Sequence, residues 1–285
     1  MNFVLEAFEP AFMQRALIGS LVAVAATSLV GTWVVLRGLS FLGDALAHGV
    51  IPGIALAVLW GFNPIAGAFI AALLMSGMVS VISSRTAIRE DTAIGLLFVG
   101  MLSLGIVIVS KSQSFSTEVT ALLFGDVLGV TTSDIRNQTI ATVIVAIASV
   151  ILYRPLLALT FNRTKAQTLG MRPALAHGAL LVMLALSIVA SFQAIGTLLV
   201  FGLLVGPPAT ASLLARRVPL IALISILLGS ICVVAGLVVS FHYGTAGGAT
   251  IAGFSVLQFF VALVGHQIVD LARSGFARQR GASAA

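Results

Sequence analysis

Two side chains of metal-ligating type stand four residues apart in an apolar part of the sequence. Asp44 and His48 occur in the run Leu42-Gly-Asp-Ala-Leu-Ala-His-Gly-Val-Ile-Pro-Gly53. On a helix, this spacing places both side chains on one face, about one turn apart. A carboxylate and an imidazole together suit Mn²⁺, Zn²⁺ or Fe²⁺ better than Mg²⁺ or Ca²⁺, which prefer oxygen ligands alone. We therefore predict that this pair binds a divalent transition-metal ion.

The composition identifies an integral membrane protein. Of the 285 residues, 59% are hydrophobic and 8% are charged, and the mean hydropathy is +1.15. A soluble domain has roughly 45–50% apolar and about 25% charged residues. The 15 basic and 9 acidic residues cannot cover a soluble surface, which excludes soluble enzymes. The net charge of +6 comes from basic residues scattered between apolar runs, a pattern that indicates membrane topology and not nucleic-acid binding.

Charges, prolines and polar clusters divide the chain into nine apolar stretches, each close to the roughly 20 residues that cross a bilayer. They are Ala16–Leu36, Ser40–Trp60, Pro64–Ser84, Thr92–Ser110, Gln138–Tyr153, Leu175–Phe192, Gly196–Ala215, Pro219–Phe241 and Thr250–Leu271. Val119–Val130 is too short to span, so we expect a re-entrant or surface helix or a short broken span there. The predicted fold class is all-α: a polytopic membrane protein with about eight to nine transmembrane helices.

The distribution of basic residues predicts the orientation. Alternating the loops between the two sides places twelve basic residues on one side and three, Arg15, Lys111 and Arg136, on the other. The positive-inside rule then puts the N-terminus outside and the C-terminus in the cytoplasm. We expect one transmembrane domain over residues 1–272, a disordered cytoplasmic tail over 273–285, and a bacterial inner membrane as the location. With Cys232 as its single cysteine, the chain can form no intramolecular disulfide and no cysteine-based metal site.

The depth of Asp44 and His48 makes them candidates for function. If the second span starts near Ser40, His48 lies roughly 12 Å into the membrane, where ionisable groups are costly and mark functional sites by default. Two ligands make a weak site, so a symmetric dimer that supplies the pair twice would complete four-coordination. A second interpretation stays open: the two side chains could hydrogen-bond each other and only stabilise helix packing.

Small residues surround the pair. Gly43, Gly49 and Gly53, together with Pro52, allow either close helix approach or a break in the span that opens backbone carbonyls toward a pathway. The spacing does not decide between these uses. Pro52 is therefore a candidate for a gate.

Further ionisable residues are weaker candidates. His266 and Asp270 repeat the four-residue spacing near the cytoplasmic end of the last span, where we expect a structural interface pair more than a metal exit site. His177 and His242 fall at span ends where water can solvate them. Asp126, in Leu122-Leu-Phe-Gly-Asp126, fits an external gate or an N-cap or turn.

No enzyme motif is present. The sequence contains no GxxxxGK[ST] loop, no HExxH and no GxSxG, and therefore no recognisable nucleotide-hydrolysing or proteolytic machinery. The longest cytoplasmic connection, Tyr153–Pro173, has an amphipathic middle at Asn162–Leu169 that ends in Gly170. This pattern is typical of a short helix lying at the membrane surface.

Four ordered motifs resemble the metal-type ABC importer permeases, the membrane subunits of manganese, zinc and iron uptake systems. They are Leu36-Arg-Gly-Leu-Ser-Phe-Leu-Gly-Asp-Ala-Leu-Ala-His-Gly-Val-Ile-Pro-Gly53, Asp91-Thr-Ala-Ile-Gly95, Leu122-Leu-Phe-Gly-Asp126, and Gln193 to Ala211 followed by Arg216-Arg217. The resemblance covers nearly the whole chain.

The resemblance implies a homodimeric permease that docks a cytoplasmic ABC ATPase dimer and receives its ion from an extracytoplasmic metal-binding protein. In that family the acid and histidine of the second span are associated with the transported metal, and here they match Asp44 and His48. The family's coupling helix, which contacts the ATPase, matches Phe161–Pro173, with these residues at its centre: Lys165, Ala166, Leu169 and Gly170. The chain departs from the family pattern at Asn162, where an acidic residue is common.

These implications predict a transport subunit with no nucleotide site and no cofactor of its own, embedded in lipid, with a divalent metal ion (Mn²⁺ or Zn²⁺, or Fe²⁺) as cargo. The competing interpretation is an ion- or proton-coupled secondary transporter in which Asp44 and His48 relay protons. Against it stand the absence of visible inverted repeats and the presence of the coupling-helix motif.

Overall fold

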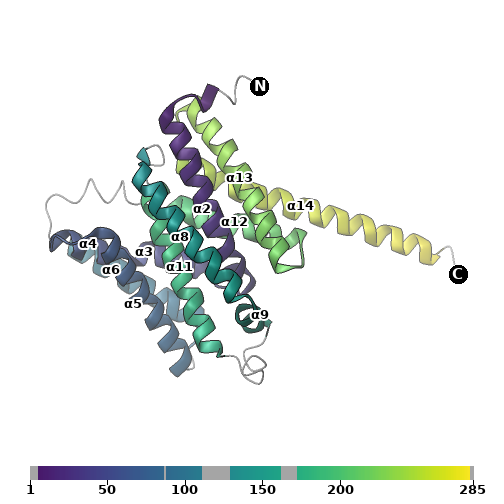
Figure 1. The fold of residues 1–285 in the computed structure, drawn as a ribbon. Coiled ribbons are helices and arrows are strands. Elements are labelled where there is room, and N and C mark those ends of the chain that lie inside the picture. Colours follow the sequence, from purple (N-terminus) through teal and green to yellow (C-terminus); the bar gives the residue numbers. More distant parts are fainter. Residues whose placement is uncertain (1–5, 87, 111–128, 162–171, 283–285) are drawn as a thin grey trace.

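The computed structural model describes residues 6–86, 88–110, 129–161 and 172–282, and all regular structure within these ranges is helical (Figure 1). The helices are α2 (Ala11–Leu36), α3 (Ser40–Gly49), α4 (Ile51–Leu59), α5 (Pro64–Arg85), α6 (Glu90–Ser110), α8 (Thr132–Ile151), α9 (Tyr153–Phe161), α11 (Pro173–Ile195), α12 (Thr197–Leu214), α13 (Val218–Tyr243) and α14 (Gly247–Ala282).

The predicted all-α, polytopic architecture is confirmed. In the described part of the chain, eight segments are long and apolar enough to cross a membrane. One of these eight segments joins α3 and α4. The seventh predicted span, Gly196–Ala215, is not among the eight; it coincides with α12, whose apolar part Leu199–Leu214 is shorter than the others. The predicted range of about eight to nine spans therefore matches the helices observed.

Helix α2 lies at the centre of the bundle and contacts α8, α11, α12 and α13. Its buried residues are mostly small or apolar, and two-thirds of its apolar window is covered by other helices. Close approach requires glycine at Gly31, because a Cβ atom there would meet the backbone carbonyl of Leu204 on α12. A helix that is apolar on all sides is typical of the interior of a membrane bundle.

The second predicted span divides into α3 and α4 at Val50. Val50 keeps near-helical angles (φ −78°, ψ −17°), so the chain direction changes little. The cause lies at Pro52, which has no N–H to donate to the carbonyl of His48 one turn earlier. The break that the sequence allowed therefore occurs directly after the Asp44–His48 segment.

Close helix approach occurs on the same span. Gly53 of α4 lies against Gly67 of α5, and a Cβ added to either residue would meet the backbone carbonyl of the other. Gly49 lies against the Met75 side chain of α5 in the same way. The structure thus uses Pro52 for the interruption and the glycines for packing.

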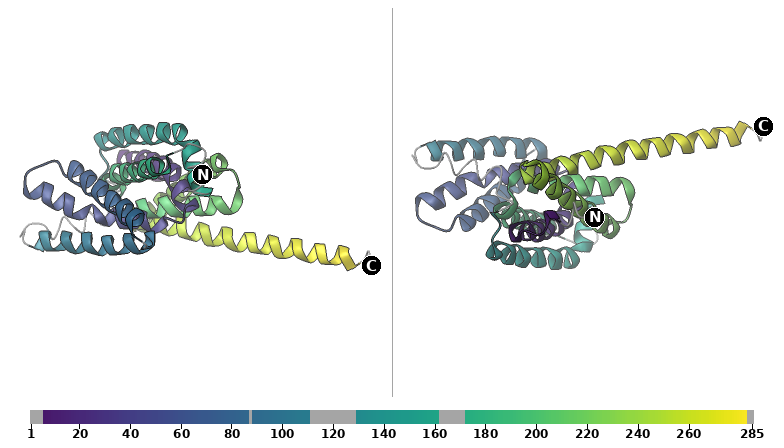
Figure 2. Two further views of the ribbon diagram at one scale, coloured as in Figure 1. Left: turned by 90° about the horizontal axis from the view of Figure 1, so that it is seen from below. Right: turned by 90° about the horizontal axis from the view of Figure 1, so that it is seen from above.

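Helix α14 extends far beyond the bundle, as both views in Figure 2 show. The backbone remains helical to Ala282, whereas the sequence analysis expected a disordered tail from residue 273. The residues between Phe276 and Arg280 are mainly alanine, arginine and glutamine, which favour helix. Val119–Leu128 and the predicted surface helix at Asn162–Leu169 lie outside the described residues.

Candidate functional site

Asp44 and His48 are in contact on α3. The Nδ1 atom of His48 lies 3.5 Å from Oδ1 of Asp44 and 3.1 Å from the Asp44 backbone carbonyl oxygen. All six other residues from Leu42 to Gly49 are buried, but His48 and Asp44 keep 27% and 29% of their side chains exposed. The pair therefore occupies the open face of an otherwise buried helix.

The hydrogen bond determines which nitrogen of His48 is available. A carbonyl oxygen can only accept, so Nδ1 carries the proton and donates it to the Asp44 carbonyl. Nε2 then presents its lone pair, the usual arrangement for a metal-binding or proton-accepting imidazole. The ring of Phe98 on α6 lies edge-on to His48, with centroids 5.8 Å apart and an interplanar angle of 89°.

Packing on three sides holds α3 in position. Gly43 lies against Leu204 of α12, and Gly49 lies against Met75 of α5. On the α6 side, Phe41 contacts the same Phe98 ring that supports His48, with centroids 5.8 Å apart. These contacts fix the rotation of α3 about its axis, and with it the direction of the two polar side chains.

Asp44 and His48 together offer two side chains of metal-ligating type, one carboxylate and one imidazole. Across the residues that the structure describes, no three histidine, cysteine, aspartate or glutamate side chains gather closely enough to hold a metal ion. Zinc sites use at least three protein ligands. Within one chain, the described residues therefore bring only these two side chains of metal-ligating type together on α3.

The other predicted site residues lie elsewhere. Pro52 is buried, and its ring faces Gly105 of α6. His242 bonds through Nδ1 to the Val238 carbonyl oxygen at 2.9 Å. His266 is exposed on α14, while the side chain of Asp270 is outside the described set. The remaining predicted site residues either end a helix, as Phe161 ends α9, or fall outside the described ranges: Asp126, Lys165, Ala166, Leu169 and Gly170.

A charged cluster that the sequence analysis missed joins three helix ends. Nη1 of Arg37, just after α2, lies 2.9 Å from Nδ1 of His177 on α11. Nε2 of the same imidazole lies 3.3 Å from Oε1 of Glu90, the first residue of α6. His177 is 7% exposed, so the expectation of a water-solvated side chain is wrong. A small cavity of about 90 Å³ adjoins the cluster.

We expect His177→Ala to lower stability by about 1–3 kcal/mol, because it removes an imidazole that contacts two charged side chains. Thermal unfolding in detergent checks this, with Leu175→Ala, at a position that is 62% exposed on the same helix, as the matched control. Equal melting temperatures for the two variants would contradict a stabilising role for the cluster.

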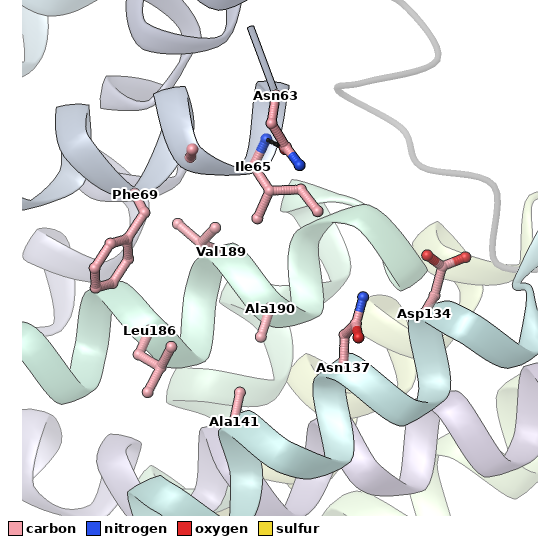
Figure 3. Close-up of a pocket in the computed structure, with 10 residues that line it drawn as sticks. Asn63, Ile65, Phe69, Asp134, Asn137, Ala141, Leu186, Val189 and Ala190 are labelled. Atoms are coloured by element: carbon pink, nitrogen blue, oxygen red, sulfur yellow. Dashed lines mark hydrogen bonds between the residues drawn. The ribbon is translucent and has the colours of Figure 1, made fainter.

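A larger cavity of about 390 Å³ lies between α5, α8 and α11 (Figure 3). Its polar lining residues are Asn63, Asp134 and Asn137, and most other lining residues are apolar. Asn63 accepts a hydrogen bond from the Ile65 amide at 2.8 Å, and Asp134 accepts one from the Thr131 amide at 3.0 Å. The side chains of Asn63 and Asp134 are therefore already hydrogen-bonded to the backbone at the starts of α5 and α8. For this reason the cavity offers a poorer metal site than α3 does.

Comparisons with known proteins agree with this architecture. Residues 9–266 match the ABC 3 transport family. The chain is 36% identical over 255 residues to the manganese import system permease protein ScaB of Streptococcus parasanguinis, covering 88% of this chain and 91% of that protein. It is 31% identical over 264 residues to the manganese transport system membrane protein MntC of Listeria monocytogenes, covering 93% and 94%.

Solved structures give the same result. The chain matches the structure of PsaBC from Streptococcus pneumoniae in complex with Fab, with a TM-score of 0.81, 31% identity, and coverage of 92% of this chain and 94% of that chain. A metal-chelate type ABC transporter in an inward-facing conformation, at 14% identity and a TM-score of 0.72, shares the fold. The chain therefore belongs to the ABC 3 transport family, as a multi-pass permease of the bacterial plasma membrane.

Proposed function

We propose that this permease carries a divalent transition-metal ion into the cytoplasm as the membrane subunit of an ATP-binding-cassette importer, with Mn²⁺ as the first candidate and Zn²⁺ or Fe²⁺ as the others. The observation that carries the proposal is the contact between Asp44 and His48 on the open face of α3. Relatives named for manganese transport support the choice of Mn²⁺, and a Haemophilus influenzae relative, 32% identical, is named a probable iron transport system membrane protein.

The metal site is shared between two copies of the chain. One chain offers one carboxylate and one imidazole, and a second copy related by two-fold symmetry supplies the same two groups again. The exposure of slightly more than a quarter of each side chain supports this arrangement, because a partner's ligands could reach the ion from that side. Two carboxylates attract a dication, and two imidazoles disfavour Mg²⁺ and Ca²⁺.

A cytoplasmic ABC ATPase dimer supplies the energy, and an extracytoplasmic metal-binding protein delivers the ion. The motif Phe161–Pro173 contacts the ATPase, chiefly through Lys165, Ala166, Leu169 and Gly170. With twelve basic residues on one side of the membrane and three on the other, the N-terminus is outside and this motif is cytoplasmic. The chain itself needs no nucleotide site, and residues 1–272 form its permease domain.

Transport proceeds by alternating access. The binding protein releases its ion above the dimer axis, where the paired Asp44 and His48 receive it. ATP binding and hydrolysis then move the coupling segments and reopen the pathway inward. The connection to α3 is short: His177 on α11, the helix that follows the coupling segment, contacts Arg37, and α3 begins three residues later.

An alternative remains for the same pair of side chains. A carboxylate 3.5 Å from an imidazole could relay protons in an ion- or proton-coupled secondary transporter. Only the importer requires an ATPase partner. Affinity purification of the tagged chain from cells that express the cognate ATPase therefore separates the two proposals.

We expect the ATPase to copurify with the wild-type chain and with Asp44→Asn, but at least about tenfold less with Leu169→Asp, because burying a new charge in a docking surface is costly. Phe62→Asp, at a position that is 66% exposed in the turn between α4 and α5, on the side of the membrane opposite the coupling segment, is the control for a newly introduced carboxylate. Failure of the wild-type chain to retain the ATPase would favour the secondary transporter.

A further inference from the structure

A groove of about 520 Å³ lies at the arginine-rich ends of α2, α8 and α13, and its described lining residues include none from α3. Helix α2 contacts both α8 and α13 there (Figure 1). The lining is almost entirely apolar. Trp33 and Tyr153, which both line the groove, form an edge-to-face pair with centroids 5.8 Å apart. Tryptophan and tyrosine favour the boundary between hydrocarbon and lipid headgroups.

One buried polar atom faces this groove without a partner. Ser149 of α8 lines the groove and is 8% exposed, and its hydroxyl makes no hydrogen bond. Thr32 across the groove is satisfied, because its hydroxyl donates to the Ser28 carbonyl at 2.7 Å. Leaving a buried hydroxyl unpaired costs about 1–3 kcal/mol. A ligand with an acceptor oxygen at this depth would remove that cost.

Positive charge gathers at the mouth of the groove. Arg154 directly follows Tyr153, and Arg217 directly precedes Val218, the first residue of α13 and a lining residue. Arg154, Arg216 and Arg217 are all exposed. Arg217 is also the N-cap of α13 and makes no side-chain cap bond, so the first N–H groups of this helix add to the positive field. None of the described residues that line the groove is acidic.

The dimensions suit one leaflet of a bilayer. From Val218 to Ile226, both lining residues, an α-helix rises about 12 Å, which is close to half of a hydrocarbon core about 30 Å thick. The groove therefore runs from the headgroup level toward the membrane centre. The arginines lie at its headgroup end, and Ser149 lies about one helical turn closer to the membrane centre than Tyr153.

We propose that this groove binds an anionic glycerophospholipid from the leaflet on the arginine-rich side of the membrane. The phosphate lies between Arg154 and Arg217 at the start of α13, an ester oxygen accepts the hydroxyl hydrogen of Ser149, and an acyl chain fills the apolar part. Guanidinium groups bind phosphate through two parallel hydrogen bonds, and basic pockets between transmembrane helices recognise anionic headgroups. The occupancy of this site is independent of the transported ion.

Native mass spectrometry of the delipidated protein tests the ligand class. Three probes are titrated: phosphatidylglycerol, diacylglycerol with the same acyl chains, and inorganic phosphate. We expect the protein to retain phosphatidylglycerol and to bind the other two probes at least about tenfold more weakly. Diacylglycerol lacks the phosphate that the arginines would bind, and inorganic phosphate lacks the acyl chains that would fill the groove. Equal retention of diacylglycerol, or equally tight binding of phosphate alone, would overturn the proposal.

Matched variants locate the lipid. Ala146→Trp fills the groove, whereas Ile147→Trp adds the same ring to the neighbouring residue of α8, which is 54% exposed and does not line the groove. The double variant Arg154→Gln/Arg217→Gln removes the two arginines proposed to hold the phosphate and leaves Arg216 in place, without touching the core. Arg85→Gln, exposed at the same end of the bundle, is its control.

We expect Ala146→Trp and the double arginine variant each to weaken phosphatidylglycerol binding by about tenfold or more, and neither control to change it. Retention that is the same in all four variants would overturn the proposal. A change of oligomeric state in Ala146→Trp, but not in Ile147→Trp, would also overturn it, because the groove would then receive a second copy of the chain.

Discussion

Replacing Asp44 by asparagine is expected to reduce ATP-driven Mn²⁺ uptake by at least about 100-fold. The amide keeps the size of the side chain but removes its negative charge, and the loss of even an indirect metal partner costs 10–100-fold. In the proposed symmetric dimer, the substitution removes two carboxylates at once. His48→Ala should have a similar effect, because no other histidine, cysteine or acidic side chain of the described residues completes the site. Initial rates of uptake into vesicles with the ATPase and binding protein measure both effects.

The control for this experiment is Gln267→Ala, which removes an exposed polar side chain from α14. Its uptake rate should equal that of the wild-type chain. The Asp44 and His48 variants should also still form dimers and retain the ATPase, since neither side chain is in the core. Wild-type uptake rates in both Asp44→Asn and His48→Ala would leave the pair with a packing role only.

Replacing Gly67 by leucine is expected to destabilise the protein by well over the roughly 1–3 kcal/mol of ordinary overpacking. The first added atom would already meet the backbone carbonyl of Gly53, and a backbone atom cannot move aside as a flexible side chain can. Helices α4 and α5 would have to separate. Because α4 follows α3 with only Val50 between them, we expect uptake to fall together with the melting temperature.

Gly77→Leu provides the matched control on the same helix. An added Cβ at Gly77 has no atom within 4 Å, and the residue is exposed. The melting temperature of this variant in detergent should equal or exceed that of the wild-type chain, since glycine is a poor helix former. A similar loss of stability in both variants would show that the Gly53–Gly67 contact is not essential to the packing of α4 against α5.

Much of the fold could be predicted from the sequence because the bilayer requires long apolar helices. Each predicted span coincides with a helix or, for Ser40–Trp60, with two consecutive helices. The placement of Asp44 and His48 on one face of a helix followed from the four-residue helical repeat and is confirmed. Their role as metal ligands stays a prediction. The four ordered motifs pointed to the family of metal-type ABC importer permeases, which the comparisons confirm.

What could not be predicted depends on contacts between distant segments. Pro52 and Gly53 left a helix break and close packing open, and both occur: Pro52 interrupts the helix, and Gly53 packs against Gly67 of α5, a partner that no local pattern identifies. Arg37 and His177 are 140 positions apart, and no local pattern indicates that they meet. The roles of Asp126 and of the coupling helix stay predictions.

The central claim, ATP-driven inward transport of a divalent transition metal, is tested most directly by measuring metal accumulation in sealed vesicles that contain the chain, its ATPase and the binding protein. Mn²⁺, Zn²⁺ and Fe²⁺ are offered in turn, with ATP on the cytoplasmic side or with a proton gradient alone. The account predicts accumulation of one of these ions with ATP and none with the gradient. Accumulation that follows the proton gradient and ignores ATP would contradict it and would assign Asp44 and His48 to proton coupling.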